Sequence, residues 1–79
     1  MYNWQNHIIT DSEILLGKPT IKGTRISIEF ILERLADGWS ESQILENYPR
    51  LSNNDLKAVH AFTYEAFKDG LLFMNTKRA

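Results

Sequence analysis

The segment from residue 16 to residue 27, LGKPTIKGTRIS, restricts the fold of this chain more than any other part of the sequence. Gly17 and Gly23 can adopt backbone conformations that other residues rarely take, while Pro19 fixes its own φ and favours an extended residue before it. Two isoleucines supply apolar anchors, and three basic residues stand within eight positions. These features predict an ordered, positively charged arm in front of a helical body. The alternative is a plain connecting loop.

Three runs of apolar residues with helical spacing follow the arm, and each run has its own start and stop signals. A serine suited to N-capping precedes each run: Ser27, Ser40 and Ser52. Ser40 has Gln43 three positions later as a capping-box partner, and Ser52 has Asp55 at the same spacing. The predicted helices have about eleven, eight and fifteen residues, and the last one ends at Phe67 or Lys68. The second and third have helix-turn-helix proportions.

Short extended pieces precede these helices. Ile8-Ile9-Thr10 has β character and Thr20-Ile21-Lys22 offers a second strand, whereas Ile14-Leu15-Leu16 fits either a strand or a single turn. The polar residues before them are expected to be loose, apart from Tyr2 and Trp4, which we expect to pack on the body. The sequence therefore predicts a single, mainly α domain, a tri-helical helix-turn-helix core with a short N-terminal β arm. Its expected parts are the arm at residues 1–26, the core at residues 27–70 and a tail at residues 71–79.

Several motifs occur in order along the chain: Gly17-Lys18-Pro19, Ile21-Lys22-Gly23-Thr24-Arg25-Ile26, Gly38-Trp39-Ser40, Ile44-Leu45 and Tyr48-Pro49-Arg50-Leu51. With these motifs, about residues 5–66 of the chain resemble the bacterial domain-of-unknown-function 433 family. The resemblance implies a small helix-turn-helix domain with a short β element in front. It also implies an antitoxin of a toxin–antitoxin pair, whose usual partner is a PIN-like nuclease encoded by the adjacent gene.

Length and cysteine content restrict the class of protein. A chain of 79 residues makes one small core of marginal stability, so a homodimer is expected. The absence of cysteine excludes disulfides and thiolate metal sites, and it fits a reducing cytoplasm. No stretch approaches the ~20 apolar residues that span a bilayer, and the first residues lack the pattern of a signal peptide. We therefore expect a soluble, cytoplasmic protein that has no contact with a membrane.

The net charge of −1 is unevenly distributed along the chain. Residues 1–26 have a net charge of +1 and residues 71–79 one of +2, whereas residues 27–70 carry eight acidic against four basic residues. Neutralisation of phosphate by Lys and Arg dominates affinity for DNA, so an acidic helical body is poorly suited to that ligand. Any contact with DNA must depend on local basic residues or on a dimer.

The third predicted helix carries the candidate contacts to DNA. If it is a recognition helix, its first residues reach base edges. The candidates for binding operator DNA are Asn53, Asn54, Lys57 and His60. Asparagine can pair with adenine, and lysine with guanine or phosphate. The alternative gives these residues ordinary capping and surface roles, because Ser52-Asn53-Asn54-Asp55 is also a common helix start.

The arm contains the strongest basic cluster of the sequence: Lys18, Lys22 and Arg25. These side chains are candidates to bind phosphate or an acidic pocket of a partner protein, because arginine offers a bidentate fork suited to either. The alternative pairs Arg25 with Glu29, four residues later. A PIN-like nuclease would hold metal ions with clustered carboxylates, so a positive arm could neutralise that site. The same argument applies to Lys77 and Arg78.

Two apolar stripes run along the third predicted helix, about a third of a turn apart. One stripe is expected to pack on the first two helices. The other, together with the apolar run after Gly70, is a candidate surface for a second subunit or a partner. The candidate residues are Phe62, Ala66, Leu71, Leu72 and Phe73. The alternative is a single wide core face.

No pattern of catalytic residues stands out. His7 and His60 have no metal-ligand spacing; His60 is expected to be partly buried and His7 to lie on the surface. The sequence has no recognisable nucleophile–base pair, phosphate-binding glycine loop or supported pair of carboxylates, so we expect no enzyme, cofactor or metal. The leading interpretation is an antitoxin that binds a PIN-like ribonuclease, with repression of its own operator as an accompanying role. The alternatives are a DNA-binding regulator without a toxin and a protein-interaction module without nucleic acid.

Overall fold

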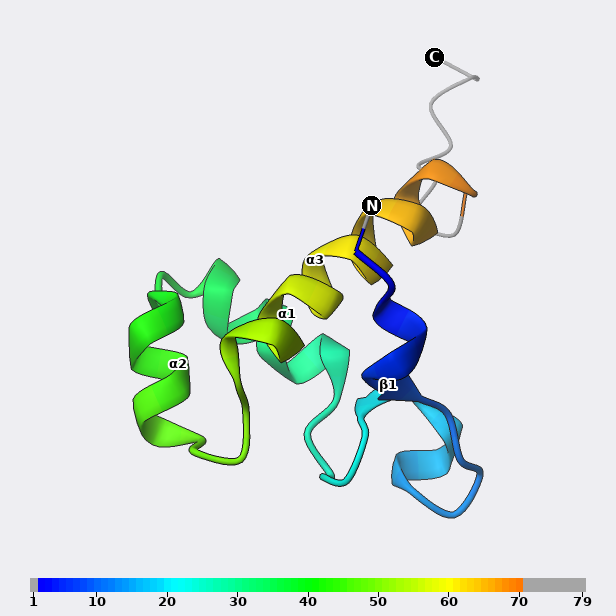
Figure 1. Ribbon diagram of the computed structural model, residues 1–79, viewed down its shortest axis with the longest axis horizontal. Helices are drawn as coiled ribbons and strands as arrows, with labels where there is room; N and C mark the ends of the chain where they lie inside the picture. The colour runs from blue at the N-terminus through cyan, green and yellow to red at the C-terminus, as the bar shows by residue number, and fades with distance from the viewer. Residues whose placement is uncertain (1, 71–79) are drawn as a thin grey trace.

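The computed structural model describes residues 2–70 of the chain. Within this range the chain forms two short 3₁₀ turns, two short strands and three α-helices (Figure 1). In chain order these are η1 (Trp4–Asn6), β1 (Ile8–Ile9), η2 (Leu15–Gly17), β2 (Thr20–Ile21), α1 (Ile28–Ala36), α2 (Glu41–Asn47) and α3 (Asn53–Lys68). The predicted small, mainly helical domain with a short N-terminal pair of strands is confirmed.

Local hydrogen bonds set the start of each α-helix. The Ser27 side chain accepts a hydrogen bond from the backbone N–H of Phe30, at a distance of 2.9 Å. Ser40 and Ser52 both take part in reciprocal capping boxes, with Gln43 and Asp55 as their partners. These contacts satisfy backbone donors that a helix leaves unpaired in its first turn. The three predicted N-caps are therefore confirmed.

The predicted arm is an ordered structure rather than a plain loop. β1 and β2 pair antiparallel, with Ile8 opposite Ile21, and the backbone N–H of Ile21 donates to the carbonyl of Ile26. Gly23 turns the chain between these contacts with a φ of 82°, a conformation that residues with a Cβ rarely adopt. The sequence at residues 14–16 fits either a strand or a single turn, and in the structure Leu15 and Leu16 belong to the 3₁₀ turn η2.

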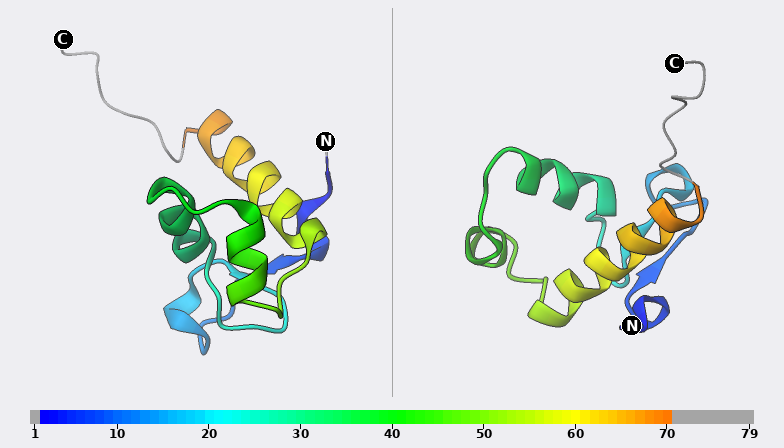
Figure 2. Two further views of the ribbon diagram at one scale, coloured as in Figure 1. Left: turned by 90° about the vertical axis from the view of Figure 1, so that its left-hand side faces the viewer. Right: turned by 90° about the horizontal axis from the view of Figure 1, so that it is seen from above.

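The core lies where the arm and the three helices meet. Its largest fully buried side chains are Ile21, Ile31, Ile44, Leu56, Val59 and Thr20. Figures 1 and 2 show α1 and α2 on one side of α3, with η1 against the other side. Tyr2 and Trp4 pack against the core, as expected for these two aromatics. The expectation that the polar residues around them are loose is wrong for residues 3–6, because Asn3 caps the 3₁₀ turn η1.

Candidate functional site

An open groove with a volume of about 530 Å³ lies between η2, the start of α1 and the end of α2. Its lining combines apolar side chains with two cations of the predicted basic cluster. The lining residues are Leu15, Leu16, Lys18, Arg25, Ile26, Ser27, Phe30 and Tyr48. Pockets of this size accept small ligands or several side chains of a partner. We call this feature the arm groove.

Aromatic contacts hold the helical wall of the arm groove. Ser27 caps α1 and so places Phe30 in its first turn, where the ring meets Tyr48 edge-to-face with centroids 5.3 Å apart. The guanidinium of Arg34 lies 4.9 Å from the centroid of the Phe30 ring, and Trp39 stacks on Tyr48 at 6.3 Å. Such edge-to-face and cation–π contacts restrict the rings, so this wall is preformed.

The opposite wall contains two leucines in an unfavourable backbone conformation. Leu15 and Leu16 have φ values of 50° and 59°, the left-handed region that costs a residue with a Cβ roughly 1–2 kcal/mol. Hydrogen bonds from the N–H of Gly17 to the carbonyl of Ile14 and from Lys18 to Leu15 hold this turn. The Leu16 side chain is 93% exposed. A large apolar side chain is thus presented to solvent at the edge of the groove.

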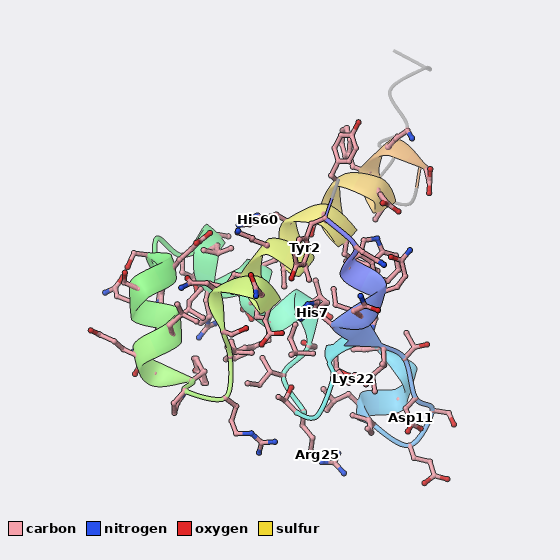
Figure 3. All side chains as sticks on the ribbon, viewed as in Figure 1. Tyr2, His7, Asp11, Lys22, Arg25 and His60 are labelled. Carbon is pink, nitrogen blue, oxygen red and sulfur yellow. The ribbon has the colours of Figure 1, made fainter. Side chains whose placement is uncertain are left out.

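The three cations of the arm differ in their contacts. Lys18 Nζ lies 3.1 Å from Glu29 Oε1, so the predicted alternative of an Arg25–Glu29 pair is wrong, and Lys18 takes that partner. Lys22 and Arg25 are exposed, and within residues 2–70 neither forms an ion pair. Figure 3 shows Arg25 extending away from the body at the edge of the molecule.

Arg50 adds a further cation to this surface. Its guanidinium donates a hydrogen bond to the carbonyl of Gly23, across 27 residues of sequence. By sequence Arg50 belongs to the acidic helical body, but the fold brings it against the turn between Lys22 and Arg25. No sequence pattern identifies Arg50 as a residue of this site, because its contact with Gly23 depends on how the connection between α2 and α3 packs on the arm.

The candidate DNA-binding residues lie exposed on α3. Lys57 lies four residues after Asn53, and His60 lies three residues after Lys57. This spacing places the three side chains on one face of the helix. His60 is exposed rather than partly buried, and its Nε2 lies 2.8 Å from Glu41 Oε2 on α2. This face therefore combines the predicted polar side chains with an adjacent carboxylate, which is unfavourable next to phosphate.

Tyr2 and His7 of the N-terminal segment meet Asp55 beside the start of α3. The Tyr2 hydroxyl lies 2.9 Å from His7 Nε2, and His7 Nδ1 lies 2.9 Å from Asp55 Oδ1. The expectation that His7 is a surface residue is wrong, since it is half-buried between these partners. The arm groove is not lined by these side chains, so the geometry indicates a structural link between the N-terminal segment and α3.

The predicted dimer surface on α3 is partly covered by the chain itself. The Phe62 ring is half-buried and meets Trp4 edge-to-face, with centroids 4.8 Å apart, and Ala66 is only 9% exposed. η1 therefore covers part of this face through Trp4, while Phe62 also lines a second cavity of about 270 Å³ together with Ile28 and Leu32. A partner surface at these two positions stays a prediction. The other candidates of this surface and of the basic tail lie outside the described residues: Leu71, Leu72, Phe73, Lys77 and Arg78.

Residues 2–70 contain no cluster of three or more His, Asp or Glu side chains arranged to hold a metal ion. In the same range, no helix combines the length and apolar character needed to cross a membrane.

Comparison with known proteins agrees with the fold. A family model described as "Protein of unknown function (DUF433)" matches residues 8–63. A crystal structure of a DUF433 member protein from Anabaena variabilis ATCC 29413 is similar, with a TM-score of 0.76 and 26% sequence identity. The match covers 82% of this chain and 64% of that chain, so this chain spans slightly less than two thirds of its relative. A search of curated proteins found no match. Because the family model spans most of its length, the chain belongs to the DUF433 family.

Proposed function

We propose that the protein is an antitoxin that binds and neutralises a PIN-like ribonuclease. The observation that carries this proposal is the arm groove, in which apolar walls and the exposed cations Lys18 and Arg25 face solvent together. Apolar anchors with charged residues at the rim are typical of sites that bind another protein. The toxin class itself comes from the family resemblance.

Charge complementarity supports a nuclease of this kind as the partner. A metal-dependent nuclease holds its ions with clustered carboxylates, which leaves its active site negatively charged when the metal is absent. Lys22 and Arg25 are exposed and form no ion pair within the described residues, and Arg25 extends away from the body (Figure 3), so they are available to such a site. Binding there would exclude both metal and RNA from the nuclease.

The test is co-expression of the tagged chain with the products of its neighbouring genes, followed by a nuclease assay on any stoichiometric complex. We expect a tight complex in which ribonuclease activity is silenced. Lys22→Ala combined with Arg25→Ala should weaken inhibition, whereas the control Lys57→Ala on α3 should leave it unchanged. If the arm variant inhibits as well as the unmodified chain, neutralisation by these cations is wrong. Recovery of the chain without any partner would contradict the antitoxin proposal.

Repression of the operator is a second candidate function, favoured by one observation. α2 and α3 have helix-turn-helix proportions, and Asn53, Asn54 and Lys57 are exposed at the N-terminal end of α3, where a recognition helix reaches base edges. The acidic character of the helical body opposes this role, so two subunits would be needed to contact two half-sites.

Band-shift experiments with the upstream DNA at several salt concentrations test this second function. Asn54→Ala with Lys57→Ala should abolish the shift and leave binding of the nuclease intact, which would establish two separate surfaces. A DNA shift without any nuclease partner would instead favour a regulator without a toxin. A nuclease complex without any DNA shift would favour a protein-interaction module.

A further inference from the structure

We propose that the arm groove is the primary anchoring site for the partner protein, and that it takes an acidic segment carrying a bulky apolar side chain. This inference rests on the proposed function only in taking the partner to be the nuclease. It goes beyond that function, since it assigns the main contact with the partner protein to the arm groove and not to α3 or to the arm cations alone.

The chemistry of the walls defines the segment that fits. Leu16, Ile26 and Phe30 all belong to the apolar lining, and the Phe30 ring is held in place by Tyr48, so a leucine or an aromatic side chain is the expected anchor. Lys18 and Arg25 belong to the same lining, which favours a segment with carboxylates next to that anchor. A basic or uncharged segment would leave Arg25 without a partner in the complex, because within residues 2–70 only Lys18 of these two cations has an ion pair, with Glu29.

The strained turn is an independent observation that points to the same place. Two consecutive leucines hold left-handed φ values, and one of them exposes nearly its whole side chain. An asparagine or glycine would suit this backbone better, and a polar residue would suit the exposure better. Unfavourable conformations of this kind persist at sites that clamp a ligand. The side chain of Leu16 gains burial only when a partner covers it.

Leu16→Asn is the variant that tests the groove without disturbing the fold. Asparagine tolerates the left-handed conformation, and the side chain it replaces makes little contact with the rest of the protein. We expect affinity for the nuclease, measured by titration calorimetry with the full chain, to fall by about tenfold or more. Arg25→Glu should weaken binding as well, by reversing the charge at the rim.

Phe67→Asn is the matched control. Phe67 is another exposed apolar side chain, 64% exposed on α3, and it does not line the arm groove. Its replacement should leave affinity unchanged. If Leu16→Asn binds the nuclease as tightly as the unmodified chain does, the groove is not the anchor, although the antitoxin function would stand. A loss confined to Phe67→Asn would move the interface to α3 and overturn the inference.

A peptide titration separates failure of the groove from failure of the antitoxin proposal. Two synthetic peptides are added to the ¹⁵N-labelled full chain, one with a Leu-Phe pair flanked by glutamates and one with the same pair flanked by lysines. Shifts of the amides at residues 15–18 and 25–30 with the acidic peptide alone support the inference, even if no nuclease is found. No response there to either peptide, or an equal response to both, overturns it.

Two other occupants would be visible in the same spectra. Dilution of the free chain would move the groove amides if a second copy filled the groove. A short single-stranded oligonucleotide would move them if the cations and rings bound nucleic acid instead. If the groove amides respond to dilution or to the oligonucleotide but not to the acidic peptide, the proposal is wrong.

Discussion

His7 connects two parts of the molecule that lie 48 residues apart. One ring nitrogen contacts the Tyr2 hydroxyl and the other contacts Asp55, which also accepts a hydrogen bond from the backbone N–H of Ser52. The N-terminal segment is therefore attached to the first turn of α3 by side chains as well as by packing. Hydrogen bonds in a half-buried position each contribute about 1 kcal/mol, so this link is a measurable part of the stability of a small domain.

Tyr2→Phe should lower the free energy of unfolding by about 1 kcal/mol, because it removes only the hydroxyl that contacts His7. Urea denaturation of the full chain measures the effect. Tyr64→Phe is the control, since the Tyr64 side chain is exposed, and it should change stability by less than about 0.5 kcal/mol. Equal losses from the two variants would mean that the Tyr2 hydroxyl contributes no more than a bond to water.

Leu16→Asn should leave the free energy of unfolding unchanged or raise it by up to about 1 kcal/mol. The replacement relieves strain at a φ of 59° and removes almost no buried surface. The same denaturation series checks this. Leu56→Asn is the contrasting change, because it would bury an amide in the core and unfold the protein. A clear loss of stability in Leu16→Asn would show that the leucine supports the fold.

Each α-helix is stabilised at its start by a serine and, for two of them, by a capping box. This matters most for α2, which has only seven residues, too few for an isolated helix to form in water. Its end carries Tyr48, which forms part of the arm groove. The local cap and the contacts of Ile44 and Tyr48 with the core together keep this element helical.

Ser40→Ala should lower the free energy of unfolding by about 1 kcal/mol, because the first turn of α2 loses its side-chain acceptor. Ser42→Ala is the matched control within the same helix. Ser42 is exposed, so its replacement should change stability by less than about 0.5 kcal/mol. Thermal unfolding followed by circular dichroism compares the two. A similar change in both variants would show that the cap of Ser40 makes no contribution of its own.

The whole molecule depends on its N-terminal segment to complete a small core. Trp4 packs edge-to-face on Phe62, so η1 covers part of the α3 face that was predicted as a dimer or partner surface. A domain of this size buries a modest share of its surface, so each large aromatic has a strong effect on stability. The arm groove, at about 530 Å³, is larger than the cavity of about 270 Å³ that Phe62 lines.

Trp4→Ala should lower the free energy of unfolding by about 2 kcal/mol, less than for a fully buried tryptophan because Trp4 is half-buried. It should also expose Phe62 and promote self-association at high concentration. Urea denaturation and sedimentation velocity measure the two effects. Gln5→Ala, an exposed change in the same turn, should alter neither. A stable, monodisperse Trp4→Ala variant would show that η1 contributes little to the core.

Much of the fold could be predicted because its signals are local. A capping serine acts on residues two or three positions away, and helical periodicity acts over three or four, so the limits of α1, α2 and α3 follow from neighbouring residues. The ordered arm follows in the same way from Pro19, Gly23 and the two isoleucines at positions 21 and 26. The cations Lys18 and Arg25 could be selected as candidates for the same reason.

Tertiary packing alone decided which distant groups meet. The contacts of His7 with Asp55, of Arg50 with Gly23 and of Trp4 with Phe62 each join segments 27 to 58 positions apart. No local pattern encodes such pairs, because they depend on the angles at which the elements pack. The arm groove is of this kind, because its cations and its capped helices follow from local sequence, whereas their position around a common space follows from tertiary packing.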